Sequence, residues 1–247
     1  MVSIFFVIAF ILFKFLFSED SKYHKLNRYE HLFGVISNQV YNSLAKVVYN
    51  KKEEQFSISV KPYLQENALT CEVASLRSAL AYQGVYVTED ELLEKLTFDT
   101  KDPITVDGVW GDPERGFVGD VNGSIFKRTG FGVYEKPIRD LALNYRYAEV
   151  IENADLYKIL GQVKNGNPVI VWGLLSRRAP VSWNTKDGRR IEVMPGEHAR
   201  VVAGFTGKID NPSKIILIDP IYGRIFMETS IFLSDWEIMD NRAVVVY

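Results

Sequence analysis

The hydrophobic pattern divides the chain into three stretches of different character. Residues 1–17 are almost continuously apolar. Within residues 18–55, apolar positions from 27 to 50 recur at the spacing of one amphipathic helix, which we expect to form a stalk or a pro-segment lying on the domain that follows. From residue 56 to 247, shorter apolar runs alternate with polar turns. This last pattern is typical of a globular domain of ordinary size.

The first stretch has the character of a signal or anchor segment. About 16 residues of helix reach roughly 24 Å, which is short of the roughly 30 Å hydrocarbon core unless the bilayer thins locally. No small-residue cleavage site follows residue 17, which favours an uncleaved membrane anchor. Lys22, Lys25 and Arg28 favour a cytoplasmic position for the following chain, whereas a signal-type segment exports it. We expect an extracytoplasmic domain, and both orientations stay open.

Within residues 56–247, predicted helices come first and predicted strands second. A strand is predicted over residues 56–60, and helices over 71–83, 89–96, 137–145 and 154–165. Strands are predicted over 169–172, 191–193, 199–205, 214–218, 223–227 and 243–246, with a short helix from a Ser230 cap to residue 237. This order predicts an α+β fold with a C-terminal antiparallel sheet. Residues 99–132, rich in Gly, Asp and Pro, are predicted to be a long loop that lines a cleft.

Composition excludes several classes of protein. Lys and Arg total 29 against 31 Asp and Glu, so no overall field favours nucleic acid. A single cysteine and three histidines rule out an intrachain disulfide and leave too few ligands for a typical structural zinc site. We therefore expect no metal and no cofactor.

The single cysteine, Cys71, stands at the predicted start of a helix whose inward stripe includes Leu76 and Leu80. The macrodipole and the free N–H groups of a helix N-terminus favour a thiolate, which is the reactive form of cysteine. A buried structural cysteine is the alternative, because free cysteines are often buried. The position in the first turn favours a nucleophile.

Three other residues complete a candidate active site. His198 stands at the mouth of an apolar strand, and Asp219 ends the next strand. An aspartate there can accept a hydrogen bond from the imidazole Nδ1–H and orient the ring. Gln65 ends an extended stretch six residues before Cys71, from where its amide can help to hold an oxyanion. Taken singly, each residue also suits an ordinary role in a strand end, a turn or a loop.

The motifs around these residues resemble those of one family. They are Pro62–Gln65, Cys71–Leu76, Gly116–Gly119, Gly130–Tyr134, Gly196–His198 and Ile218–Pro220. Together they resemble the bacterial cysteine peptidases that process bacteriocin leaders, the C39-like peptidases of the papain-like clan. The sequence departs from that pattern at Ala74, where a hydroxyl residue is expected, and at Arg77 and Ser78, where an Ala-Met pair is expected.

The resemblance implies a papain-like fold in which the helical half carries the cysteine and the sheet carries the histidine and aspartate. It implies that Gln65, Cys71, His198 and Asp219 act as oxyanion donor, nucleophile, base and orienting acid. The expected activity is hydrolysis of a peptide bond in a peptide or protein substrate. Two alternatives stay open: a transglutaminase-like acyl transferase, and a catalytically silent peptide-binding or surface-anchored module.

Overall fold

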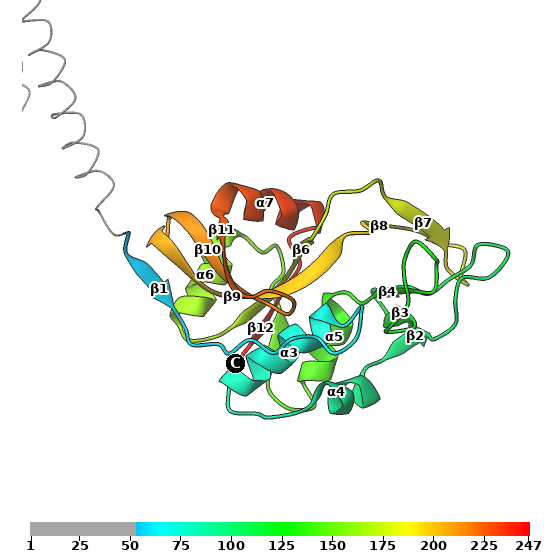
Figure 1. Cartoon of the computed structure of the whole chain (residues 1–247), viewed down its shortest axis with the longest axis horizontal. Helices are drawn as coiled ribbons and strands as arrows, with labels where there is room; N and C mark the ends of the chain where they lie inside the picture. The colour runs from blue at the N-terminus through cyan, green and yellow to red at the C-terminus, as the bar shows by residue number, and fades with distance from the viewer. Residues whose placement is uncertain (1–52) are drawn as a thin grey trace, which may run out of the picture. The chain divides into compact units, whose positions relative to one another are not determined.

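The computed structural model describes residues 53–247, which form one compact unit, Glu53–Tyr247. Figure 1 shows this unit in colour. The expected anchor at residues 1–17 and the expected helix at 27–50 lie outside the described residues. Within residues 53–247, no helix combines the length and the apolar character that a membrane span requires.

An antiparallel sheet of seven strands forms the centre of the domain. Its order is β11-β10-β9-β6-β12-β5, and β1 pairs with β9 at one end. The strands are β1 (Gln55–Ser57), β5 (Ala148–Val150), β6 (Val169–Leu174), β9 (Glu197–Lys208), β10 (Asn211–Asp219), β11 (Gly223–Glu228) and β12 (Ala243–Val246). All their pairings are antiparallel. The predicted α+β class with a C-terminal antiparallel sheet is therefore confirmed.

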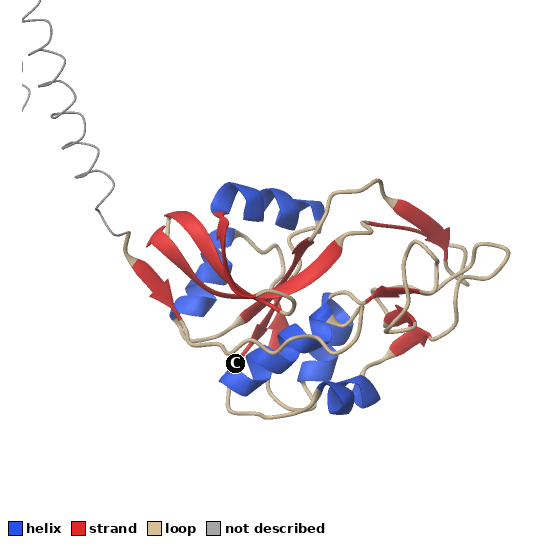
Figure 2. Cartoon of the chain, in the orientation of Figure 1, coloured by secondary structure: helices blue, strands red, loops and turns tan. Residues whose placement is uncertain are grey.

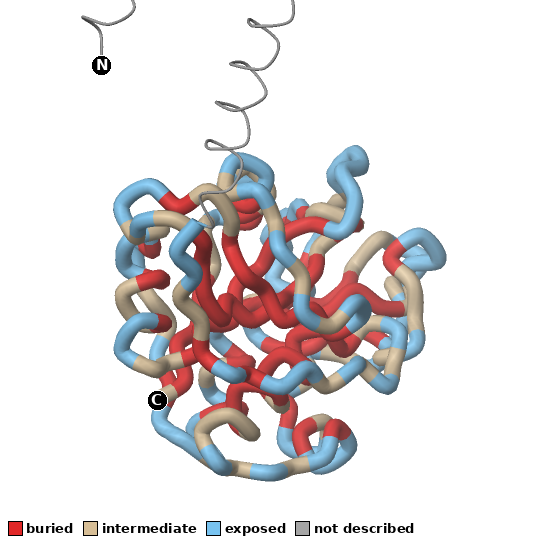
Figure 3. Tube along the Cα trace, turned by 60° about the vertical axis from the view of Figure 1, so that its left-hand side comes forward, coloured by how far each residue is buried: buried red, intermediate tan, exposed pale blue. Residues whose placement is uncertain are grey.

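Helices cover this sheet (Figure 2). They are α3 (Cys71–Tyr82), α4 (Glu89–Lys95), α5 (Glu135–Ala142), α6 (Leu156–Lys164) and α7 (Thr229–Ile238). Helix α3 packs against β9, and α7 packs against β6; in Figure 1, α7 lies above the sheet and α3 below it. Fully buried Leu76 and Leu80 from α3 and Trp172 from β6 belong to one continuous core. Figure 3 shows buried segments of the chain running through the middle of the domain. This core fixes the start of α3 against the sheet.

The prediction of one long loop over residues 99–132 is wrong. The segment takes part in a three-stranded sheet of β2 (Phe98–Thr100), β3 (Phe117–Gly119) and β4 (Gly130–Gly132). Each strand has three residues, which is too short to show a period of two in the sequence. The three-residue strand β5 escaped prediction for the same reason. The four-residue strand β7 (Val181–Asn184), which pairs with β8 (Arg190–Val193), was also not predicted.

Several predicted boundaries also move. Helix α5 starts at Glu135, so Pro137 lies in its first turn, where a missing N–H costs nothing. Helix α6 starts after an Asp155 cap that accepts from the Lys158 N–H. The N-cap of α7 is Glu228, so the predicted Ser230 cap is wrong. By contrast, α4 starts at Glu89 as predicted, behind a capping box of Thr88 and Glu91.

Candidate active site

The start of α3 and the start of β9 meet at Ala199. The Ala199 N–H donates to Cys71 Sγ at 3.4 Å, and Ser75 Oγ donates to the Ala199 carbonyl at 3.2 Å. Cys71 and Ser75 are one helical turn apart and therefore share a face. These two bonds hold the nucleophile candidate against the residue that follows His198.

His198 and Asp219 form a buried pair on the sheet. His198 Nε2 lies 3.1 Å from Asp219 Oδ2, and the two side chains are 2% and 0% exposed. The other carboxylate oxygen accepts the N–H groups of Ile221 at 2.7 Å and Tyr222 at 3.0 Å. The sequence had led us to expect the Nδ1 nitrogen in this contact, and the structure uses Nε2 instead. Nδ1 is therefore left for another partner.

Arg200 is a member of this cluster that sequence reasoning missed. Its Nε donates to Asp219 Oδ2 at 2.7 Å, and one of its terminal nitrogens donates to the Leu174 carbonyl at 3.3 Å. Side chains two positions apart in a strand share a face, so the spacing of His198 and Arg200 was the available signal. Asp219 thus faces a cation and an imidazole at once.

These contacts set the charges of the pair. Burial alone would raise the pKa of Asp219, but the hydrogen bond to His198, the Ile221 N–H and Arg200 bring that pKa well below its ordinary value. Burial lowers the pKa of His198, Asp219 raises it, Arg200 lowers it, and the net direction is down. A neutral imidazole beside a charged aspartate is the favoured state of the resting site.

Gln65 lies beside the pair, with its amide turned towards its own loop. Its backbone N–H donates to the Pro220 carbonyl at 2.9 Å, which places the residue next to the turn after Asp219. The side-chain Nε2 donates to the carbonyls of Asn67 at 2.8 Å and Ala68 at 3.1 Å. Its Oε1 is buried without a partner. The structure brings Gln65 to the site, but its amide is not aimed at Cys71 in this state.

Glu89, the first residue of α4, holds the loop that carries Gln65. Its carboxylate accepts from the Glu66 N–H at 2.9 Å, from Asn67 Nδ2 at 3.0 Å and from Thr70 Oγ1 at 2.5 Å. Glu89 is fully buried. Three donors from one loop converge on it, so it fixes the path of the chain into Cys71. The sequence places Glu89 at the start of a predicted helix and gives no sign of this contact with the loop.

Arg77 and Ser78, two of the three residues that depart from the resembled motif, also contact this loop. Ser78 Oγ accepts from the Tyr63 N–H at 3.1 Å. Arg77 pairs with Glu66 at 2.7 Å and lies over the Tyr63 ring at 4.5 Å. Arg77 and Ser78 therefore bind α3 to the segment that leads to Gln65, which an Ala-Met pair could not do.

The surroundings of Cys71 differ from the expectation for a helix N-terminus. The residue is 5% exposed, and its Sγ donates to Glu72 Oε2 at 3.3 Å. Burial, the charge of Glu72 and the charge of Glu197 raise the pKa of the thiol well above its ordinary value, although the Ala199 N–H acts the other way. These effects outweigh that of the helix N-terminus on the pKa of the thiol, so Cys71 is a thiol in the resting state. Within residues 53–247, no hydrogen bond joins Cys71 to His198.

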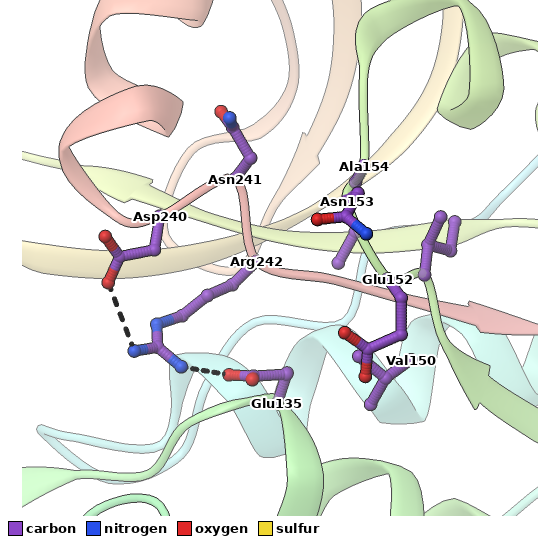
Figure 4. A pocket seen from close by; sticks show the side chains of 10 residues that line it. Glu135, Val150, Glu152, Asn153, Ala154, Asp240, Asn241 and Arg242 are labelled. Carbon is purple, nitrogen blue, oxygen red and sulfur yellow. Dashed lines mark hydrogen bonds and ion pairs between the residues drawn. The ribbon is translucent and has the colours of Figure 1, made fainter.

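The best-formed cavity within the described residues lies away from Cys71. It has a volume of about 280 Å³ and is lined by Glu135, residues 150–154 and residues 240–243 (Figure 4). In it, Arg242 pairs with Glu135 at 2.5 Å and with Asp240 at 3.3 Å. No residue expected at the active site lines this cavity. The described residues also hold one cysteine and one histidine, which falls short of the sulfur- and nitrogen-rich ligand sets of zinc sites.

Comparison with known proteins agrees with the arrangement of helix and sheet. The Peptidase_C39 like family matches residues 57–244. The chain is 25% identical to a C39-like peptidase from Bacillus anthracis whose crystal structure superposes with a TM-score of 0.66, covering 79% of this chain and 98% of that one. The peptidase domain of Streptococcus ComA, a bifunctional ABC transporter of a quorum-sensing pathway, is 16% identical, with a TM-score of 0.46 and coverage of 76% and 98%.

No curated protein matches the chain. The expected papain-like fold is confirmed by the Bacillus anthracis structure. Since the family match extends over more than half of the sequence, the chain belongs to the Peptidase_C39 like family.

Proposed function

We propose that the chain is a cysteine peptidase that cleaves a peptide bond through an acyl-enzyme on Cys71. The observation that carries this proposal is the convergence at Ala199. Its N–H contacts Cys71 Sγ at 3.4 Å, and the preceding residue, His198, is paired with Asp219 at 3.1 Å. This proximity supports a site in which a nucleophile, a base and an orienting acid come from distant parts of the chain.

In the proposed reaction His198 takes the thiol proton through Nδ1, because Nε2 is engaged by Asp219. The thiolate attacks the peptide carbonyl carbon, and the oxygen becomes an oxyanion. The Cys71 N–H and the Gln65 amide would stabilise that charge. The imidazolium then protonates the leaving amine, and a water molecule activated by His198 hydrolyses the thioester. Asp219 stays ionised throughout and stabilises the imidazolium.

The test compares hydrolysis and thiol labelling in matched variants. Wild type, Cys71→Ala, His198→Ala and Asp210→Asn would be incubated with a mixture of unfolded proteins, and new N-termini would be identified by mass spectrometry. Asp210 is exposed in the turn between β9 and β10 and serves as the control. We expect new termini with wild type and Asp210→Asn, and none with the other two. Equal cleavage by Cys71→Ala would refute the proposal.

The burial of Cys71 favours a second candidate, a peptide-binding module without turnover. A thiol that is 5% exposed with a raised pKa is a poor nucleophile until its neighbours change. If the chain is such a module, wild type should produce no new N-termini, and the immobilised protein should retain peptides. Cys71→Ala should then retain the same peptides.

A further inference from the structure

Two glutamates, one fully buried and one partly buried, lie beside Cys71 and have no part in the proposed reaction. Glu72 follows Cys71 in α3 and is fully buried. Its Oε1 accepts the Val133 N–H at 2.9 Å, and its Oε2 accepts the Cys71 thiol at 3.3 Å. The thiol hydrogen therefore points to a carboxylate and not to an imidazole.

The second glutamate, Glu197, begins β9. A carboxyl oxygen of Glu197, one of Glu72 and the sulfur of Cys71 all lie within 4.8 Å of one another. The Glu197 Oε1 atom is buried without a hydrogen-bond partner. We call these two residues the Glu72–Glu197 pair.

A glycine makes room for the pair. Gly132 adopts a φ of +138°, and a Cβ added there would lie 2.6 Å from Glu72 Oε1 and 3.5 Å from Glu197 Oε2. The first distance is far inside van der Waals contact, so a side chain at this position would displace Glu72. The chain thus reserves space for two carboxyl groups in a place where burial penalises charge.

Two carboxyl groups this close cannot both be ionised away from water, so the pair retains a proton to higher pH than either group would alone. Burial raises the pKa of Glu72 to about 7, although the Val133 N–H opposes the shift. Burial and the charge of Glu72 raise the pKa of Glu197 well above its ordinary value. At neutral pH the pair therefore holds a proton and carries part of a negative charge.

The other charged and titratable groups near the pair do not remove the proton that it shares. Arg200 and Arg242 both lower the pKa of Glu197. Arg200, however, is paired with Asp219 at 2.7 Å, and Arg242 is paired with Glu114 at 2.6 Å and with Glu135. Tyr134 is the remaining neighbour; burial and Glu197 raise its pKa, so it stays neutral.

We propose that the Glu72–Glu197 pair shares a proton beside Cys71 and, together with the burial of the sulfur, keeps it a thiol to a higher pH than an ordinary cysteine. The two glutamates are positioning residues: they set the pH at which the nucleophile becomes a thiolate. This inference rests on the proposed function only in taking Cys71 as the nucleophile. The pair attracts the thiol hydrogen through Glu72 Oε2 and repels a thiolate through its remaining charge.

The experiment measures the rate of iodoacetamide alkylation against pH by whole-protein mass. Cys71 is the single cysteine, so every adduct reports on this site, and no peptide substrate is needed. The variants are Glu72→Gln, Glu197→Gln and the double variant. Each keeps the side-chain shape and removes the charge. Glu192→Gln is the matched control, because Glu192 is an exposed residue of β8.

The double variant should shift the alkylation midpoint to the acid side by about one pH unit or more, which is the usual effect of one nearby charge. At neutral pH its alkylation should be about tenfold faster than that of wild type. The single variants should shift less, and Glu192→Gln should follow the wild-type profile. A double variant with wild-type melting behaviour and an unshifted or alkaline-shifted profile would overturn the proposal.

Wild type alone provides a second test that does not depend on the folding of any variant. If its alkylation rate has already reached a plateau below neutral pH, Cys71 is a thiolate there and the proposal fails. A rate that still rises steeply above about pH 8.5, the ordinary pKa of a cysteine thiol, supports it. Loss of hydrolysis in all variants, without any change in these profiles, would instead bear on the proposed function.

Discussion

Replacing Asp219 by asparagine should destabilise the domain, because it removes the acceptor shared by two buried donors. An asparagine can keep its oxygen on the N–H groups of Ile221 and Tyr222. Its NH₂ group would then face His198 Nε2 and Arg200 Nε, which lie 3.1 and 2.7 Å from the present oxygen. Donors would meet donors at that position.

The magnitude follows from Arg200. Its side chain is 6% exposed, and Asp219 is its ion-pair partner. Removing one member of a buried ion pair typically costs about 3–5 kcal/mol, because the other charge stays buried and uncompensated. For a domain of this size, that corresponds to a fall in melting temperature of roughly 6–20 °C. Arg200→Met in the same chain should recover part of the loss, since no buried charge is then left without its partner.

The stabilisation that the Asp219 carboxylate provides should depend on pH. The folded state lowers the pKa of Asp219 below its ordinary value of 3.8. The stability from this carboxylate is therefore present above pH 3.8 and is lost as the pH falls towards the folded pKa. The difference in free energy of unfolding between wild type and Asp219→Asn should be largest at neutral pH and should decrease as the pH falls below 3.8.

Chemical denaturation of wild type, Asp219→Asn, Arg200→Met, the double variant and the Asp210→Asn control provides the measurement. The four non-control proteins form a double-mutant cycle. If Asp219→Asn loses no more stability than Asp210→Asn, or if the two single losses simply add in the double variant, the buried ion pair does not contribute as argued.

Three further outcomes are expected. Gln65→Ala should lower kcat by on the order of 10² to 10³ while leaving alkylation of Cys71 nearly unchanged; unaltered hydrolysis, as expected for the exposed Gln55→Ala control, would make Gln65 an ordinary loop residue. Glu89→Ala should lower the free energy of unfolding by about 1–3 kcal/mol or more, because three loop donors lose their shared acceptor. Limited proteolysis should then cut the loop before Cys71, and an uncut loop would contradict this. Full-length protein should sediment with membranes and a chain starting at Glu53 should not; a soluble full-length chain would refute the anchor expected at residues 1–17.

The sequence predicts the long elements well and the short ones poorly, for a physical reason. Helix α3 and the strands β9 and β10 carry long apolar stretches because most of each element is buried in the core. The three-residue strands β2, β3 and β4 are too short to show such a stretch, and their pairing depends on the turns between them. Tertiary packing, which a sequence pattern does not record, sets their positions.

The same distinction applies to the candidate site. The sequence motifs identify Cys71, His198 and Asp219 as candidate site residues. The alternation of side chains along β9 could also have identified Arg200. Nothing in the sequence brings Glu197 to Glu72, because 125 positions separate them and their meeting depends on how α3 packs on β9. The charge state of Cys71 was mispredicted for this reason: the helix terminus is a local property, whereas the burial of the sulfur and the meeting of the two carboxyl groups depend on the fold.

The four expected catalytic residues divide between the two halves of the domain. His198 and Asp219 lie in the sheet, already paired and almost fully buried. Cys71 and Gln65 lie in the helical half, and both side chains are bonded to other partners. Turning Gln65 would break the two bonds from its Nε2 to its own loop, at a net cost of about 0.5–1.5 kcal/mol each, while its Oε1 is already unpartnered. A substrate oxyanion that accepts from the amide would offset this cost, which is consistent with catalytic hydrogen bonds that tighten when substrate binds.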